Sequence, residues 1–241
     1  MTNRLEGRRI VVTGAASGIG AAIARRFAAE GAQLALFDRD PIASRATSMI
    51  VDVADRASVD AAVARAVEAL GGIDGVVNAA GIGVIAAFAD TDEATWQGAL
   101  DVNLSGPYRV CHAALQHLLA DGTVERPATI VNISSAAALQ PLLRRSAYAA
   151  SKGGLISFTK VLAMELAPTV RANVLVPGAV DTPMVAGSFT GAALDAVVAR
   201  YAMTRLGTAD ENADAALFLT SDETAFVTGS TLSVDGGRIY H

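Results

Sequence analysis

The sequence predicts one α/β domain built on a doubly wound parallel sheet with helices on both faces. Short β-branched runs alternate with longer alanine-rich segments of helical period, which is typical of strand–helix–strand units. The runs are apolar throughout, as in strands that are buried on both sides. No linker or change of composition divides the 241 residues, so we expect residues 1–241 to form a single domain.

The apolar runs and the helical periodicity place the elements in order along the chain. The runs predict strands at 9–13, 34–37, 49–51, 75–77, 129–133, 173–176 and 231–234. The periodicity predicts helices near 18–30, 55–70, 92–120, 147–167 and 210–221. The connection between the second and third strands is short, so residues 41–48 can form two helical turns at most.

The stretch at about 183–207 differs from the rest because its apolar residues lie between glycines and Pro183. This pattern predicts a mobile substrate cap over a pocket, with a helix near 191–203. An ordinary helical hairpin is the alternative.

Composition and charge exclude several classes of partner. A net charge of -5 and a pI near 5.2 do not attract nucleic acid or anionic lipid. The longest uncharged stretch, 75–89, is shorter than the ~20 residues that span a bilayer, so no membrane segment is expected. Cys111 is the single cysteine and no signal peptide is evident, so we expect a cytoplasmic protein.

The three histidines do not form a metal-binding pattern. His112 and His117 are five residues apart and would lie on different faces of a helix, and His241 ends the chain. No metal site is therefore expected, and small molecules or copies of the chain are the expected partners.

A glycine-rich turn follows the first predicted strand. Gly14, Gly18 and Gly20 lie where this strand leads into a helix. Glycine allows a tight turn and a close backbone approach, and the free N–H groups of the helix N-terminus favour an anion. The turn therefore predicts a diphosphate site of a Rossmann-like nucleotide-binding fold, although glycines can also serve a tight turn alone.

Asp38 ends the second strand, at the position where a carboxylate can bind both ribose hydroxyls of an adenosine. A 2′-phosphate beside this carboxylate would cost several kcal/mol at intermediate dielectric, so the residue favours NAD over NADP. Arg39 is a contrary sign because it could pair with such a phosphate. The alternative is that Asp38 only caps the following turn.

The spacing of Gly14, Gly18 and Gly20 resembles that of the short-chain dehydrogenase/reductase family, and the resemblance extends over nearly the whole chain. It implies an adenine contact after the third strand, a loop against the cofactor at 78–81 with the family's second Asn replaced by Ala79, and a nicotinamide contact at 177–182. The cofactor-binding residues implied are Gly14, Ser17, Gly18, Ile19, Gly20, Asp38, Asp52, Val53, Asn78, Ala79, Gly81, Tyr148, Lys152, Pro177, Val180 and Thr182.

Tyr148 and Lys152 are four residues apart and so share one face of a predicted helix. A phenol with its ordinary pKa of ~10 is a poor base at neutral pH. A positive charge roughly 4 Å away is worth ~4 kcal/mol at intermediate dielectric, so Lys152 is expected to lower the pKa of Tyr148. The alternative is a half-buried tyrosine beside a lysine that reaches toward solvent.

The family resemblance assigns the remaining catalytic roles. Ser135, thirteen residues before Tyr148, matches the serine that hydrogen-bonds the substrate oxygen, and Asn103 matches the residue that supports a proton relay to the lysine. The reaction implied is hydride transfer between a secondary alcohol carbon and the nicotinamide. Tyr148 would transfer the hydroxyl proton, and Lys152 would also hold the ribose hydroxyls of the cofactor.

Three arginines suggest the substrate. Arg144 and Arg145 precede Tyr148, and Arg205 lies near the end of the predicted cap. An arginine three residues before the tyrosine is found in relatives that oxidise small hydroxy acids or sugar acids, whose carboxylate it can bind. We treat Arg145 and Arg205 as candidate substrate residues, with surface or subunit-contact arginines as the alternative.

Three functions are consistent with these residues. The first is an NAD-dependent dehydrogenase of a small secondary alcohol, polyol or hydroxy acid, and the second is an NADPH-dependent 3-oxoacyl-type ketoreductase. The third is a non-catalytic dinucleotide sensor or scaffold, which the combination of Asn103, Ser135, Tyr148 and Lys152 disfavours. By resemblance we expect a homotetramer assembled through the long helices near 92–120 and 147–167.

Overall fold

The computed structural model describes residues 3–44, 46–189 and 191–240, and their strands form one parallel sheet. The strand order is β3-β2-β1-β4-β5-β6-β7, and every neighbouring pair is parallel. The strands are β1 (Arg9–Thr13), β2 (Gln33–Asp38), β3 (Thr47–Ile50), β4 (Gly75–Asn78), β5 (Ala128–Ile133), β6 (Val170–Pro177) and β7 (Thr231–Val234).

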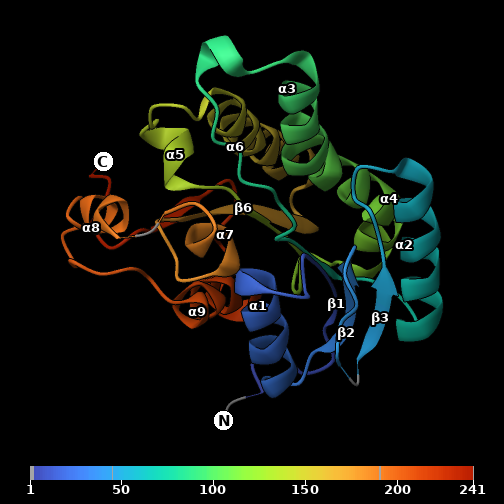
Figure 1. Cartoon of the computed structure of the whole chain (residues 1–241). Coiled ribbons are helices and arrows are strands. Elements are labelled where there is room, and N and C mark those ends of the chain that lie inside the picture. The colour runs from blue at the N-terminus through green and yellow to red at the C-terminus, as the bar shows by residue number, and fades with distance from the viewer. Residues whose placement is uncertain (1–2, 45, 190, 241) are drawn as a thin grey trace.

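Helices cover both faces of the sheet (Figure 1). On one face α1 (Gly18–Ala29) packs beside α9 (Ala209–Thr220), and Phe27 and Leu217 are fully buried there. The other face carries α2 (Arg56–Leu70), α4 (Gly106–Asp121) and α6 (Ser146–Leu166), whose apolar side chains share a core with the sheet. The predicted fold class is confirmed.

The sheet order reverses between β1 and β4, because the chain builds outward from β1 in one direction and then from β4 in the other. Ligands of open parallel sheets bind at such a switch point, outside the carboxyl ends of the strands. The turn after β1 and the loop after β4 both lie at this point.

The predicted strands are all present, with shifted ends. β3 begins two residues earlier than predicted, and β6 begins at Val170 rather than 173. The extension of β6 includes the buried Arg171, whose guanidinium donates hydrogen bonds to the carbonyls of Leu219, Ser221 and Val227. A charged residue therefore interrupts the apolar run without interrupting the strand.

The prediction of one continuous helix over 92–120 is wrong, because the segment is divided. The segment consists of α3 (Glu93–Leu100), the π-helical η2 (Asp101–Ser105) and α4. The π segment contains Asn103, which is completely buried and bonds the backbone of Ile82 in a neighbouring loop. Periodicity could not show this, because the cause is a contact between distant segments.

The segment predicted as a cap forms two short helices, α7 (Pro183–Ala186) and α8 (Ala192–Val198), so the predicted helix 191–203 is too long. The chain leaves the helix because the hydroxyl of Tyr201 accepts the N–H of Ala179 and Met203 bonds the Gly236 carbonyl. The remaining short elements are η1 (Phe88–Asp90), α5 (Ala136–Leu139) and η3 (Asp222–Thr224).

Residues 41–44 of the short connection form neither helix nor strand. Residue 45 of that connection, residue 190 of the predicted cap and His241 lie outside the described residues. Within the described ranges, no helix combines the length and apolar character needed to cross a membrane.

Candidate active site

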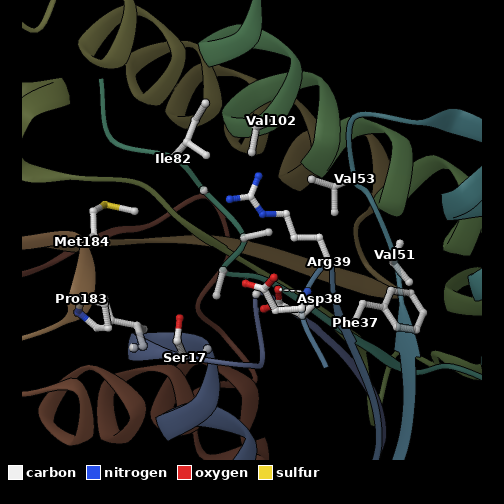
Figure 2. Close-up of a pocket in the computed structure, with 18 of the residues that line it drawn as sticks. Ser17, Phe37, Asp38, Arg39, Val51, Val53, Ile82, Val102, Pro183 and Met184 are labelled. Carbon is white, nitrogen blue, oxygen red and sulfur yellow. Dashed lines mark hydrogen bonds between the residues drawn. The ribbon is translucent and has the colours of Figure 1, made fainter. Parts of the chain in front are cut away.

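Two connected pockets open at the carboxyl ends of the central strands. The first pocket follows the ends of β1 to β4 (Figure 2), and the second lies beside α6 and the cap. They share Ile19, Ala79, Gly81, Thr182 and Met184. The first pocket is lined by the predicted residues Gly14, Ser17, Gly18, Ile19, Gly20, Asp38, Asp52, Val53, Ala79, Gly81 and Thr182. The second is lined by the predicted residues Ser135, Arg145, Tyr148, Lys152, Pro177, Val180 and Thr182.

The glycine-rich turn is closed so tightly that side chains cannot be added to it. A Cβ on Gly14 would lie 2.7 Å from the Ala80 nitrogen, and a Cβ on Gly20 would lie 2.1 Å from the Gly14 carbonyl oxygen. Ser17 caps α1 without a side-chain hydrogen bond, so its exposed hydroxyl faces the pocket together with the N–H groups of the first helical turn. This arrangement fits a diphosphate.

Asp38 caps the turn that follows β2, and it also lines the first pocket. Its carboxylate accepts the N–H of Ala16 at 2.9 Å and the N–H of Asp40 at 3.0 Å. Carboxylate oxygens have further lone pairs, so the same group can accept ribose hydroxyls. Arg39 extends away from Asp38 toward Ile82 and Val102 (Figure 2).

Among the predicted cofactor residues, Asn78 does not line either pocket. Its amide donates to the Asn132 side chain at 2.8 Å and to the Cys111 sulfur at 3.3 Å, and the residue is buried behind the loop. The loop itself reaches the pocket through Ala79 and Gly81. The predicted loop therefore borders the pocket, while its first side chain, Asn78, packs behind it.

The structure brings both Asn103 and Lys152 close to Gly81. A Cβ on Gly81 would lie 3.1 Å from the Asn103 Oδ1 and 3.3 Å from the Lys152 Nζ. The amide of Asn103 also donates to the Ser151 hydroxyl, and the Lys152 ammonium donates to the Ile133 carbonyl at 2.9 Å. Asn103 does not line either pocket, and it contacts the loop and α6 behind them.

The electrostatics of Tyr148 differ from the sequence prediction. Burial raises the pKa of Tyr148, while a hydrogen bond with Ser135 and the charge of Arg145 oppose this rise. The predicted lowering by Lys152 is wrong, because its ammonium points to the Ile133 carbonyl and burial lowers its own pKa to about 8. The cation that acts on the phenol is Arg145.

The three candidate arginines are placed differently. Arg145 is only 9% exposed, lines the second pocket and lies 5.6 Å from the centre of the Tyr148 ring and 5.5 Å from that of Phe189. Arg144 is exposed. Arg205 is exposed and pairs with Glu211 at 2.6 Å, so the structure does not bring it into the Tyr148 pocket.

Some lining residues gave no signal in the sequence. Arg238 from the C-terminal tail, Gln140 after α5 and Tyr201 after α8 all line the second pocket. They belong to no motif, and Tyr201 and Arg238 are also far from Tyr148 along the chain, so only the fold could show that they line the pocket. Met184, Val185, Phe189 and Val197 were expected in the cap, and they do line this pocket.

Comparisons with known proteins agree with this geometry. A family model described as enoyl-(acyl carrier protein) reductase matches residues 14–238. The 2-(S)-hydroxypropyl-CoM dehydrogenase 3 of Xanthobacter autotrophicus is 36% identical over 98% of both chains. The chain belongs to the short-chain dehydrogenase/reductase family. It is therefore an oxidoreductase that acts on CH–OH groups and uses a nicotinamide cofactor.

Solved structures of this family superpose on nearly the whole chain. A short-chain dehydrogenase/reductase from Brucella melitensis, described as a glucose/ribitol dehydrogenase, is 34% identical with a TM-score of 0.92 and covers 100% of both chains. A 3-ketoacyl-(acyl-carrier-protein) reductase from the same organism, complexed with NADH, is 34% identical with a TM-score of 0.90. It covers 97% of this chain and 99% of that one.

The burial of Lys152 predicts a pH-dependent stability. Its pKa falls from 10.5 in the unfolded chain to about 8 in the fold, so between these values the unfolded chain binds more protons. The free energy of unfolding should therefore rise with pH in this window, by at most about 3 kcal/mol. Urea unfolding of the wild type and of Lys152→Met at pH 7.5, 9 and 10 measures this difference.

The rise should be missing from Lys152→Met and present in Lys160→Met, which removes an exposed lysine of the same helix. If the free energy of unfolding depended on pH in the same way in the wild type and in Lys152→Met, the lowered pKa could not be assigned to Lys152.

Proposed function

We propose that this short-chain dehydrogenase/reductase is an NAD-dependent dehydrogenase that oxidises the secondary alcohol of a small hydroxy acid. The observation that carries the proposal is Arg145. It lines the pocket of Tyr148, it is nearly buried, and no carboxylate among the described residues lies within ion-pair distance of it. Its guanidinium donates a hydrogen bond to the neutral Val84 carbonyl at 3.3 Å, so the positive charge itself has no acidic partner among the described residues. A nearly buried charge of this kind favours an anionic ligand.

In the proposed reaction Tyr148 removes the hydroxyl proton of the substrate, or returns it in the reverse direction. Ser135 would hydrogen-bond the reacting oxygen, and although burial raises the pKa of Tyr148, the hydrogen bond with Ser135 opposes this rise. Asn103 and Ser151 hold the loop and helix on which Gly81 and Lys152 lie. When bound, the nicotinamide supplies the acceptor for the hydride that leaves the alcohol carbon.

The cofactor preference rests on Asp38. The turn at Gly14 to Gly20 would hold the diphosphate and Asp38 the adenosine ribose, while Lys152 would hold the nicotinamide ribose. Asp52 and Val53 would contact the adenine, and Pro177, Val180 and Thr182 the carboxamide; Thr182 is positioned by its bond to the Val180 carbonyl. Asp38 opposes a 2′-phosphate by charge.

A second candidate is an NADPH-dependent 3-oxoacyl-type ketoreductase. Two observations favour it, namely the similarity to a 3-ketoacyl-(acyl-carrier-protein) reductase and the presence of Arg39 on the wall of the first pocket. The charge of Asp38 weighs against it, so we place it second.

The assembly proposed is a homotetramer that uses the outer faces of α4 and α6. Tyr108 on α4 and Val161 and Met164 on α6 are exposed apolar side chains, which an interface between copies would cover. A reducing cytoplasm suits the single, buried Cys111.

Cofactor choice tests the role of Asp38. The wild type should bind NAD at least tenfold more tightly than NADP, which is about 1.4 kcal/mol. Asp38→Asn keeps the shape but loses the charge, so the preference should shrink through tighter binding of NADP. Fluorescence titration with both reduced cofactors measures this, with Asp60→Asn as a surface control. Preferential binding of NADP by the wild type would favour the second candidate.

Arg145→Gln tests the substrate class. KM for 2-hydroxy acids should rise at least tenfold relative to KM for neutral secondary alcohols, because only the acids lose a charge-assisted partner. The test uses the ratio of the two KM values, because loss of the Arg145 charge also raises the pKa of Tyr148, and this affects every substrate alike. Arg144→Gln, next to it and exposed, should leave the ratio unchanged. An equal effect of Arg145→Gln on acids and neutral alcohols would rule out carboxylate binding.

A further inference from the structure

The second pocket contains another arginine, Arg238, which belongs to the C-terminal tail. The tail passes beside α5 and α8 (Figure 1) and is held there by specific contacts. Asp235 accepts the N–H groups of Gly237 and Ile239, and Ile239 packs on the small apolar cluster that includes Ala136. The tail is therefore fixed on both sides of Arg238.

Arg238 is held toward the pocket by a neutral partner. Its guanidinium donates a hydrogen bond to the side-chain oxygen of Gln140, and both residues line the pocket. The Gln140 amide keeps two N–H donors, and the guanidinium keeps others, since it has five. Together the two side chains offer several donors and a full positive charge to a ligand.

The described charged side chains that line this pocket are all cationic. Among the described residues its lining includes three cationic side chains, Arg145, Lys152 and Arg238, and no carboxylate. The chain as a whole has a net charge of -5. Most other arginines of the described chain, such as Arg25 and Arg205, are paired with acids. Neither pocket arginine forms an ion pair with a described acid.

The three cations differ in what they can still bind. Lys152 donates to the Ile133 carbonyl and has its pKa lowered by burial. Arg145 lies beside Tyr148, and Arg238 lies on other elements, beside Gln140 and near Tyr201. The hydroxyl of Tyr201 already accepts the Ala179 N–H. The arginines are thus two separate positions for anions within one pocket.

We propose that Arg238 and Gln140 form a second anion subsite, so that the substrate is a hydroxy acid with another anionic group at its far end. This rests on the proposed function, in which Arg145 binds the carboxylate next to the alcohol. The walls also include Leu142, Met184, Val185, Phe189 and Val197, which suit a methylene chain between the two anions better than a polyol. The class that fits is a 2-hydroxy diacid or its terminal phosphate counterpart.

Matched pairs of substrates test this subsite. NADH formation would be measured with 2-hydroxysuccinate, 2-hydroxyglutarate and 2-hydroxyadipate, each against the 2-hydroxy monoacid with the same number of carbons. We expect kcat/KM for the diacid to exceed that for the monoacid at least tenfold at one chain length. A comparison of 2-hydroxysuccinate with 2-hydroxy-3-phosphopropanoate distinguishes a terminal carboxylate from a phosphate.

Arg238→Gln should raise KM at least tenfold for the preferred diacid and leave the matched monoacid within about twofold. Arg238→Lys should restore part of the preference, because the charge returns. Arg200→Gln removes an exposed arginine beside α8 that does not line the pocket, and it should change neither substrate. Gln140→Leu gives a second test that leaves the sequence of the tail unchanged and removes the side chain that accepts from Arg238, and it should reduce the same preference.

The outcomes separate this subsite from the proposed function. Oxidation of diacids and monoacids with equal kcat/KM, or an equal loss of both in Arg238→Gln, would overturn the subsite and leave the hydroxy acid dehydrogenase intact. Oxidation of neutral alcohols but of no hydroxy acid would overturn both. Each variant should have the same thermal unfolding temperature as the wild type, which shows that any loss of activity comes from weaker binding and not from a disturbed fold.

Discussion

The loop after β4 lies directly against the turn after β1, and the rest of the site depends on this contact. The hydroxyl of Thr13 accepts the N–H groups of Ala79 and Ala80, both at 3.1 Å, while Gly14 has no Cβ to keep the loop away. The next residue, Gly81, lies against both Asn103 and Lys152, and a Cβ on it would crowd both side chains. One close approach of two backbones therefore joins the glycine-rich turn to the side chains that we propose as catalytic.

The same contact explains why a π segment interrupts the long helix. Asn103 binds the N–H and the carbonyl of Ile82, one residue beyond Gly81, and it needs the altered helix geometry to present its amide there. The loop is thus held from β1 by Thr13 and from η2 by Asn103. Lys152 completes the arrangement from α6, with its ammonium on the end of β5.

Much of this could be predicted from the sequence, because it depends on local patterns. The strands follow from apolar runs. The glycines of the turn, Asp38, Tyr148 and Lys152 follow from spacing, and Ser135 follows from the family resemblance; all of these residues line the two pockets. The errors arise where distant segments meet. The π segment, the packing role of Asn78 and the direction of the Lys152 ammonium each depend on a contact that no local pattern contains.

The charges of the second pocket are the clearest case in which local sequence patterns do not predict the site. Spacing places Lys152 near Tyr148, but burial raises the pKa of Tyr148 and lowers the pKa of Lys152. Arg145 is the cation that opposes the rise at the phenol. Arg238 arrives from the opposite end of the chain, held by Asp235 and Gln140. The substrate class is therefore a property of the folded pocket, while the reaction class follows from the motif.

We propose that Tyr148 carries the proton transfer. The decisive measurement is the turnover of Tyr148→Phe with a 2-hydroxy acid, with NAD binding confirmed by fluorescence. We expect a loss of at least about 100-fold in kcat with unchanged cofactor affinity, because a general acid–base group has been removed. Retention of more than about a tenth of the wild-type kcat, with NAD bound, would contradict it.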